Sequence, residues 1–278
     1  MISLPKGPGS ISGLGESFKP DLNTGSMTYR IPLKVPSGVG GLTPSVALSY
    51  SSGAGNSEVG FGWSLGIPRI RRRTEKGIPR YDDSDIYTIS GVGSGELVPL
   101  SDGFYRLEIE GAYIRAQQGG NGWEVRDKSG KIYRFGYTVE SRCVGSGGQV
   151  FAWYLTDQYD TLGNHIEYQY EQHGGRPYLS IIRYNNFSAD VVAEVTFTYG
   201  ARYDALASYR SGFKVTLGQR LIRVESSVGS ELLARYALEY GSDSTLSRLS
   251  RVTAGAPRTS PPTWWIEFFH RHPIVSSC

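Results

Sequence analysis

The chain has 278 residues, with 36 glycines and 19 tyrosines but two methionines, and 20% of its residues are charged. This composition is typical of many short strands joined by turns rather than of helices. The net charge of +3 reflects 29 basic and 26 acidic residues, and this balance excludes a general attraction to nucleic acid or anionic lipid. Two cysteines, Cys143 and Cys278, are too few for a disulfide framework, so stability must come from the core.

The amino terminus, MISLPKGPGSISG, has one lysine and no apolar core segment of the kind that a secretory signal peptide needs. No stretch approaches eighteen consecutive apolar residues, so we expect no membrane span. Residues 1–25 are rich in glycine, serine and proline. This composition predicts either an extended arm that lies on another surface or a disordered segment.

A first β region is predicted for residues 26–140. Met27 to Val35 reads as a strand that ends at Pro36 and a glycine turn. Short apolar runs then alternate with Asp-Gly, Asn-Gly and Ser-Gly pairs, which supply the positive φ values of tight hairpins. We therefore predict an antiparallel meander with these strands: Ile86 to Ile89, Glu96 to Pro99, Tyr105 to Ile109, Tyr113 to Ala116, Trp123 to Arg126 and Ile132 to Phe135.

Within this region, the stretch from Leu42 to Arg80 combines a strand, a glycine-rich turn, an aromatic cluster and a basic strand. Side chains alternate from Ser45 to Tyr50, as in a half-buried strand. A phosphate-binding loop is the alternative for the glycines, but such a loop opens a helix, and no helical period follows here. Glycines that can adopt positive φ and apolar residues at period two instead predict a tight β corner: Gly53, Gly55, Gly60, Gly62 and Gly66, with Phe61, Trp63, Leu65 and Ile67.

The densest basic run follows that corner. It surrounds Ile70 in an alternating strand and lacks regularly interleaved aromatic residues, which favours a solvated strand face or an internal polar surface over a nucleic-acid site. The run consists of Arg69, Arg71, Arg72, Arg73 and Lys76.

Residues 141–149, SRCVGSGGQ, are the best candidate linker, and a second β region is predicted for residues 150–253. In the segment HIEYQYE the apolar and polar faces separate cleanly. The segment after Ser230, ELLARYALEYG, also fits a capped helix that ends at Gly241, although its context favours a strand. The predicted strands are Phe151 to Gln158, His165 to Glu171, Tyr178 to Tyr184, Glu194 to Tyr199, Phe213 to Thr216, Leu221 to Glu225 and Leu232 to Tyr240.

Two segments resemble the opening of the SpvB family, which contains the Salmonella plasmid-virulence B protein and the B subunits of insecticidal Tc toxin complexes. These are LPKGPGSISGLGESFKPDLNTGSMTYRIPL, residues 4–33, and LSYSSGAGNSEVGFGWSLGIPRIRRRTEKGIPRYDDSD, residues 48–85. A looser similarity extends to about Thr253. In addition, YDTLGN, residues 159–164, is similar to the YD repeat of Rhs and teneurin-type shells. In that turn the Asp160 side chain would bond backbone N–H groups, while Gly163 and Asn164 take left-handed positions.

Residues 254–278 depart from the family pattern. Trp264, Trp265, Phe268 and Phe269 would form an unusually apolar patch if exposed. A truncated product or a shifted reading frame would explain such a tail, and the alternative is an ordinary edge strand from Trp264 to Phe269.

Candidate chemistry is sparse. The four histidines, His165, His173, His270 and His272, lack partners at metal-ligand spacing. The acidic cluster at 82–85 lacks the spaced ligands of a calcium loop and reads as a turn with local Asx bonding. We predict no catalytic, cofactor-binding or metal residues, and no cofactor.

The resemblance raises one enzymatic alternative. The Salmonella family member carries an ADP-ribosyltransferase domain at its carboxyl end, with a Glu-x-Glu pair and a Ser-Thr-Ser strand. Glu108-Ile109-Glu110 has the first pattern, but it lies in the meander that resembles the amino-terminal region, and Ser-Thr-Ser occurs nowhere in the sequence. Transferase activity is therefore not expected here.

The sequence predicts an all-β chain of many short antiparallel strands in a Gly/Tyr-rich meander, which the resemblance makes part of a Rhs/Tc-type β shell. The resemblance implies a non-catalytic component of a secreted bacterial toxin that encloses or presents a toxic polypeptide, with a toxin C subunit, a pore-forming A subunit and a protein cargo as partners. It also implies release from the cytoplasm by a route without a signal peptide. The alternative is a surface adhesion module whose YD-type strands present tyrosines to a carbohydrate or protein.

Overall fold

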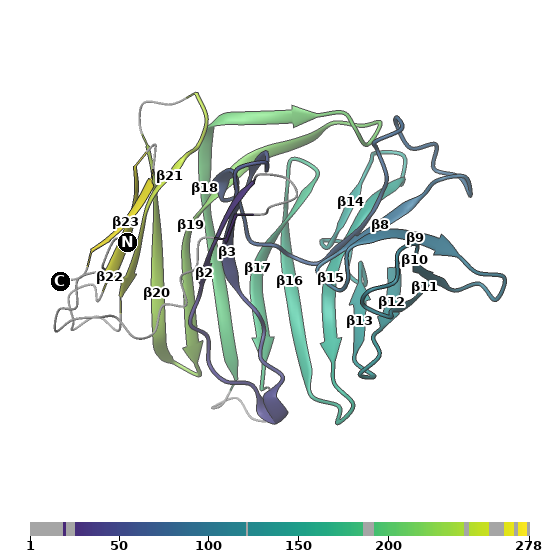
Figure 1. Ribbon diagram of the computed structural model, residues 1–278, viewed down its shortest axis with the longest axis horizontal. Helices are drawn as coiled ribbons and strands as arrows, with labels where there is room; N and C mark the ends of the chain where they lie inside the picture. The colour runs from purple at the N-terminus through teal and green to yellow at the C-terminus, as the bar shows by residue number, and fades with distance from the viewer. Residues whose placement is uncertain are drawn as a thin grey trace, which may run out of the picture.

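The computed structural model describes residues 19–20, 26–120, 122–185, 192–241, 245–255, 264–269 and 272–276. These residues form an almost entirely β structure (Figure 1), and one short 3₁₀ turn, η1 (Val39–Gly41), interrupts it. The predicted all-β, antiparallel fold is thus confirmed. None of the residues that the structure describes belongs to a helix long and apolar enough to cross a membrane.

The first half of the main sheet closes on itself. Consecutive antiparallel pairings run from β7 to β13, and β15 then pairs with both β13 and β7, which completes a ring of eight strands. Closure gives both edges of this meander a hydrogen-bonded neighbour. The members are β7 (Arg69–Arg72), β8 (Tyr87–Ser90), β9 (Gly95–Pro99), β10 (Tyr105–Leu107), β11 (Arg115–Gly119), β12 (Gly122–Arg126), β13 (Ile132–Phe135) and β15 (Val150–Tyr159).

Aromatic side chains fill the ring. Trp123 is fully buried, and its ring centroid lies 4.8 Å from that of Tyr87, 5.0 Å from that of Tyr105 and 6.1 Å from that of Trp153, each edge-to-face. This is the geometry that aromatic quadrupoles prefer. Arg72 lies over Tyr87 at 5.1 Å and pairs with Asp85 at 2.6 Å, so the charge of this arginine is neutralised beside the aromatic cluster.

The main sheet then continues from β15 through long antiparallel hairpins to β23. The predicted alternation in HIEYQYE is confirmed, since Ile166, Tyr168 and Tyr170 are buried while His165 and Glu167 are half-exposed. These strands are β16 (His165–His173), β17 (Arg176–Tyr184), β18 (Ala193–Ser208), β19 (Val215–Val228), β20 (Glu231–Tyr240), β21 (Leu249–Gly255), β22 (Trp264–Phe269) and β23 (His272–Ser276).

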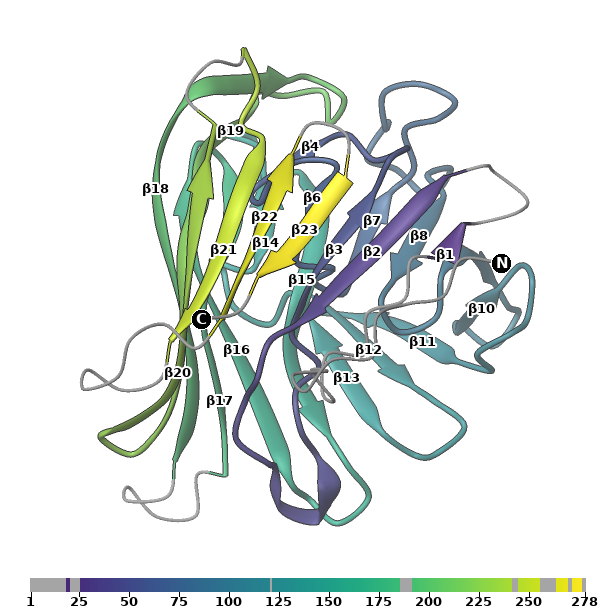
Figure 2. The ribbon, with the colours of Figure 1, turned by 60° about the vertical axis from the view of Figure 1, so that its left-hand side comes forward.

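A small amino-terminal sheet covers one face of the main sheet (Figure 2). Its buried side chains, including Ile31 and Leu48, join the same hydrophobic core as those of β16–β21. The backbone N–H of Lys34 donates to the Tyr236 hydroxyl at 2.7 Å, and the Tyr184 hydroxyl donates to the Pro36 carbonyl at 2.6 Å. The strands of this sheet are β1 (Lys19–Pro20), β2 (Met27–Pro32), β3 (Ala47–Ser51) and β6 (Trp63–Ser64).

The glycine-rich corner forms as predicted, with one difference. Gly60, Gly62 and Gly66 have positive φ, and a two-stranded hairpin of β4 (Asn56–Ser57) and β5 (Gly60–Phe61) projects from the corner. Trp63 is buried, but Phe61 is 42% exposed. The alternating pattern is wrong at Phe61 because that residue belongs to the hairpin rather than to the strand that enters the core.

A substitution at Gly60 tests how tightly this hairpin is seated. Its φ is +103°, and a Cβ atom there would lie 2.5 Å from the Ser247 carbonyl oxygen. We expect Gly60→Ala to lower the free energy of unfolding in urea by about 1–3 kcal/mol, because strain and a backbone clash add. In Gly55→Ala the new atom would meet no other heavy atom within 4 Å, and we expect a change below about 0.5 kcal/mol. Equal effects of the two substitutions would contradict this packing.

Three further predictions can be compared with the structure. The segment after Ser230 is strand β20, as preferred over a helix. The two strands predicted at 213–216 and 221–225 fall largely in one strand, β19, which runs through Gly218. The register with β18 shifts at Gly218, and its backbone N–H donates to the Tyr178 hydroxyl instead. The division into two β regions stays a prediction, but the linker expected at 141–149 contains β14 (Arg142–Val144), which pairs with β15.

The YD-type turn at 159–164 forms mostly as predicted. Asp160 Oδ1 accepts hydrogen bonds from the backbone N–H groups of Leu162 and Asn164, both at 2.9 Å. Gly163 has a φ of +84°, as expected. Asn164 does not have positive φ; its side-chain amide instead donates to Asp160 Oδ2 at 2.7 Å.

The predicted arm and tail are described only in part. Of residues 1–25, strand β1 lies inside the described residues and the rest lies outside them. The strand expected from Trp264 to Phe269 is present as β22, but it is not an edge strand, because β22 pairs with both β21 and β23. The expected apolar patch concerns side chains of residues 264–269, which lie outside what the structure describes.

Candidate functional site

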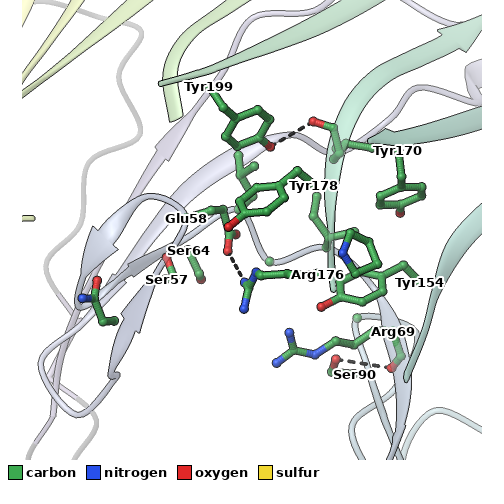
Figure 3. A pocket seen from close by; sticks show the side chains of 17 residues that line it. Ser57, Glu58, Ser64, Arg69, Ser90, Tyr154, Tyr170, Arg176, Tyr178 and Tyr199 are labelled. Carbon is green, nitrogen blue, oxygen red and sulfur yellow. Dashed lines mark hydrogen bonds and ion pairs between the residues drawn. The ribbon is translucent and has the colours of Figure 1, made fainter. Parts of the chain in front are cut away.

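A polar cavity of about 330 Å³ lies beneath the glycine-rich hairpin, between that hairpin and the main sheet. The turn after β4 contributes Glu58, β7 contributes Arg69, and β17 contributes Arg176. Tyrosines from β15, β16, β17 and β18 line the remaining walls (Figure 3): Tyr154, Tyr170, Tyr178 and Tyr199.

An ion pair crosses this cavity. Arg176 Nη2 lies 2.6 Å from Glu58 Oε2, and the two side chains are 22% and 14% exposed. Burial alone would raise the pKa of Glu58, but Arg176, its own backbone and Arg69 lower that pKa below its ordinary value. Burial alone would also lower the pKa of Arg176, whereas Tyr154 and Glu58 raise it. Both groups are therefore charged at neutral pH.

A second polar network fixes the hairpin that carries Glu58. The Arg202 side chain is fully buried, and its Nη1 and Nη2 donate to the Ser57 carbonyl at 2.7 Å and to Asn56 Oδ1 at 2.8 Å. Arg202 Nε also pairs with Asp204 Oδ1 at 2.8 Å. Asp204 in turn accepts from the backbone N–H of Ser247 at 2.6 Å. One buried arginine thus joins β4 to β18 and to the chain before β21.

Most tyrosine hydroxyls of the cavity are committed to the backbone. Tyr170 donates to the Leu155 carbonyl at 2.6 Å, and Tyr199 donates to the Leu179 carbonyl at 2.9 Å. The Tyr178 hydroxyl accepts from the Gly218 N–H at 3.1 Å. Burial raises the pKa of Tyr170 and of Tyr199 well above the ordinary value, so both hydroxyls stay neutral. The two side chains line the cavity, and their hydrogen bonds to backbone carbonyls hold them in place.

The chemistry of this arrangement is that of charge recognition. The lining contains two guanidinium groups, one carboxylate and phenol hydroxyls, and none of its residues is a histidine or a cysteine. Among the described residues no three His, Cys, Asp or Glu side chains are grouped so as to hold a metal ion. The charged and polar groups of the lining could therefore contact a charged ligand.

The residues considered from the sequence lie elsewhere. Glu108 and Glu110 follow the end of β10 and are both exposed, so they do not line the cavity. His165 Nε2 lies 2.8 Å from Asp157 Oδ1, and its ring stacks on Tyr159 at 4.4 Å. His270 lies outside the described residues.

The acidic cluster forms the Asx-type turn that the sequence predicts. Asp82 Oδ1 accepts from the Ser84 backbone N–H at 2.9 Å. Asp85 accepts from the backbone N–H groups of Arg80 and Tyr81 at 2.9 and 2.7 Å, and it also pairs with Arg72. The carboxylates of Asp82 and Asp85 thus hold the turn that enters β8.

Sequence reasoning noticed Arg69 as part of the basic run but missed the other charged residues of the cavity. Glu58 and Arg176 are 118 positions apart, and neither belongs to a short motif. An acidic residue between glycines, in a corner otherwise built for packing, is the one local signal that could have drawn attention to Glu58.

Comparison with known proteins gives a consistent result. The family model of the Salmonella virulence plasmid 65kDa B protein, SpvB, matches residues 22–110 and 102–178, which is more than half of the chain. The mono(ADP-ribosyl)transferase SpvB of Salmonella typhimurium is 25% identical over 337 aligned positions, covering 88% of this chain and 55% of that protein. This chain thus spans about half the length of the curated relatives that it matches.

Solved structures share the fold. A chain of the Photorhabdus luminescens Tc holotoxin pore superimposes with a TM-score of 0.82 at 23% identity, covering 97% of this chain and 17% of that one. The amino-terminal domain of the effector SpvB from Salmonella typhimurium superimposes with a TM-score of 0.72 at 23% identity, covering 82% of this chain and 98% of that domain. The fold, the family-model match and the sequence motifs agree: the chain belongs to the SpvB family.

Proposed function

We propose that this chain is a non-catalytic structural component of a bacterial toxin and contributes to a β shell that encloses or presents a toxic polypeptide. The observation that carries the proposal is the superposition of 97% of the chain on part of a Tc holotoxin pore. The crystal structure of TcdB2-TccC3 gives a similar superposition, with a TM-score of 0.80.

The architecture suits such a role. The long antiparallel hairpins from β15 to β23 form a wide wall, and the amino-terminal sheet covers one of its faces with apolar side chains. A wall extended by further strands would remove exposed sheet edges and separate an enclosed polypeptide from its surroundings.

The non-catalytic part of the proposal rests on the site. Catalysis by acid, base or nucleophile needs reactive groups in mutual hydrogen-bond reach. The described cavity holds an ion pair and braced tyrosines instead. The Glu108 and Glu110 side chains lie exposed, away from it. We accordingly do not assign to this chain the transferase activity for which its longer relatives are named.

By this proposal the partners are a toxin C subunit, a pore-forming A subunit and a protein cargo, and the chain is secreted from the bacterium. Co-purification tests the first partner. We expect the tagged chain, co-expressed with a C subunit from the neighbouring coding region, to elute with it as one complex in size-exclusion chromatography.

A co-expressed protein of similar size from outside toxin loci serves as the control and should elute separately. If the folded chain stays monomeric with every candidate C subunit, the shell role fails and the adhesion module becomes the better explanation.

A further inference from the structure

The cavity beneath the glycine-rich hairpin carries an excess of positive charge. Arg176 is paired with Glu58 at 2.6 Å. The guanidinium of Arg69 lines the same cavity, and it has no ion-pair or hydrogen-bond partner among the described residues. Two cations and one anion in a confined space leave one positive charge without a counter-charge.

Two further donors of the cavity lack acceptors. Arg176 Nε is buried and has no hydrogen-bond partner in the described part of the chain. The Tyr154 hydroxyl also has none there, unlike those of Tyr170 and Tyr199. Figure 3 shows the Tyr154 hydroxyl and the guanidinium groups of Arg69 and Arg176 turned toward one space. A buried donor such as Arg176 Nε is normally satisfied, and together with the Tyr154 hydroxyl and the Arg69 guanidinium it forms a set complementary to an acceptor group.

The other arginines of the same basic run are all paired. Arg71 Nη2 lies 3.0 Å from Glu75, and Arg73 pairs with Glu96. Arg72 lies 2.6 Å from Asp85. Arg69 therefore differs from its neighbours on β7, because among the described residues its guanidinium has no ion-pair partner.

The chemistry of the donors indicates the class of ligand. A guanidinium presents a planar pair of N–H groups that matches the two oxygens of a carboxylate or phosphate. The volume of about 330 Å³ suits a small molecule rather than a lone ion. Tyrosine walls, with the Tyr154 ring 5.9 Å from the Arg69 guanidinium carbon, accommodate an aromatic remainder.

We propose that this cavity binds a small organic anion, whose phosphate or carboxylate group is held by Arg69, Arg176 and the Tyr154 hydroxyl. The proposal is independent of the shell role, because it concerns a site inside the fold that needs no partner chain.

Isothermal titration calorimetry of the full chain tests the site, with phenyl phosphate, benzoate, inorganic phosphate and neutral benzyl alcohol as probes. We expect saturable one-to-one binding of phenyl phosphate or benzoate, and none of benzyl alcohol. The affinities of phenyl phosphate and benzoate show whether the site prefers a phosphate or a carboxylate group. The affinity of inorganic phosphate, compared with that of phenyl phosphate, shows whether the aromatic ring contributes to binding. Absence of saturable binding by all three anions would overturn the proposal.

Matched variants locate the binding. Arg69→Gln should weaken the best probe at least tenfold, while Arg71→Gln, on the same strand but already paired, should change affinity less than twofold. Tyr154→Phe keeps the aromatic ring, removes the hydroxyl and should weaken binding severalfold. This variant carries the test if circular dichroism shows that Arg69→Gln is unfolded. Equal weakening by Arg69→Gln and Arg71→Gln would refute the site. So would single variants Arg69→Gln and Tyr154→Phe that both bind the probe as tightly as the unmodified chain.

Discussion

Replacing Asp204 by alanine should lower the free energy of unfolding by about 3–5 kcal/mol, because it leaves the charge of Arg202 buried without its partner. The side chains of Arg202 and Asp204 are 0% and 4% exposed, and their contact is 2.8 Å long. Asp204 also accepts from the backbone and the hydroxyl of Ser247, both at 2.6 Å. Loss of this one carboxylate therefore removes the bonds by which β18 holds Ser247, before β21, and the Asn56 amide of the hairpin.

The measurement is urea unfolding at neutral pH, with Asp102→Ala as the matched control. Asp102 pairs with Arg115 at 2.6 Å, but both side chains are about half exposed, so its loss should cost less than about 1 kcal/mol. If the two substitutions cost the same, the buried network does not hold the hairpin.

The same carboxylate gives a pH signature. Burial alone would raise the pKa of Asp204, but hydrogen bonds from Arg202, Ser247 and Asn56 hold it well below the ordinary value of 3.8. A depressed pKa contributes stability that is complete above the unfolded value and is lost as the pH falls toward the folded one. The stability difference between the unmodified chain and Asp204→Asn should therefore be constant above pH 5 and shrink below the unfolded pKa of 3.8. A difference that grows on acidification would contradict the assignment.

Replacing Trp123 by alanine should cost about 3–5 kcal/mol of unfolding free energy, because it opens a large cavity inside the closed ring of strands. Trp123 is fully buried and contacts Tyr87, Tyr105 and Trp153 edge-to-face. Its loss also removes the aromatic pairs that hold β8, β10 and β15 around one centre.

Trp123→Phe provides the matched comparison. The indole Nε1 has no hydrogen-bond partner in the described structure, so phenylalanine keeps an aromatic ring and gives up no hydrogen bond. We expect it to cost less than half as much as alanine in urea unfolding. If the two substitutions are equally costly, the ring interior depends on something other than aromatic packing.

Local sequence patterns predicted the strands well where one face is buried. The strand Ile132–Phe135 has the predicted bounds, and the alternation in HIEYQYE places Ile166 and Tyr170 in the core. β18 is much longer than predicted, Ala193–Ser208 instead of residues 194–199. Its second half is mostly exposed and lacks a hydrophobic period, so pairing with β19 alone makes it a strand.

Closure of the ring and assembly of the cavity could not be predicted in this way. The ring closes because Trp153 pairs with Ile70, and the cavity is charged because Arg176 meets Glu58. Each contact joins positions far apart in the chain, and hydrophobic periodicity carries no information on which strands become neighbours. The resemblance to the SpvB family supplied the shell hypothesis, whereas the unpaired Arg69 became visible only in the folded chain.

Electron cryomicroscopy of the chain co-expressed with a C subunit is the most direct test of the shell role. The account predicts that β15 to β23 form part of a continuous wall with strands of the partner and that cargo density lies inside that wall. A complex in which the chain is attached only at the outside, with no strands shared and no enclosed space, would contradict it.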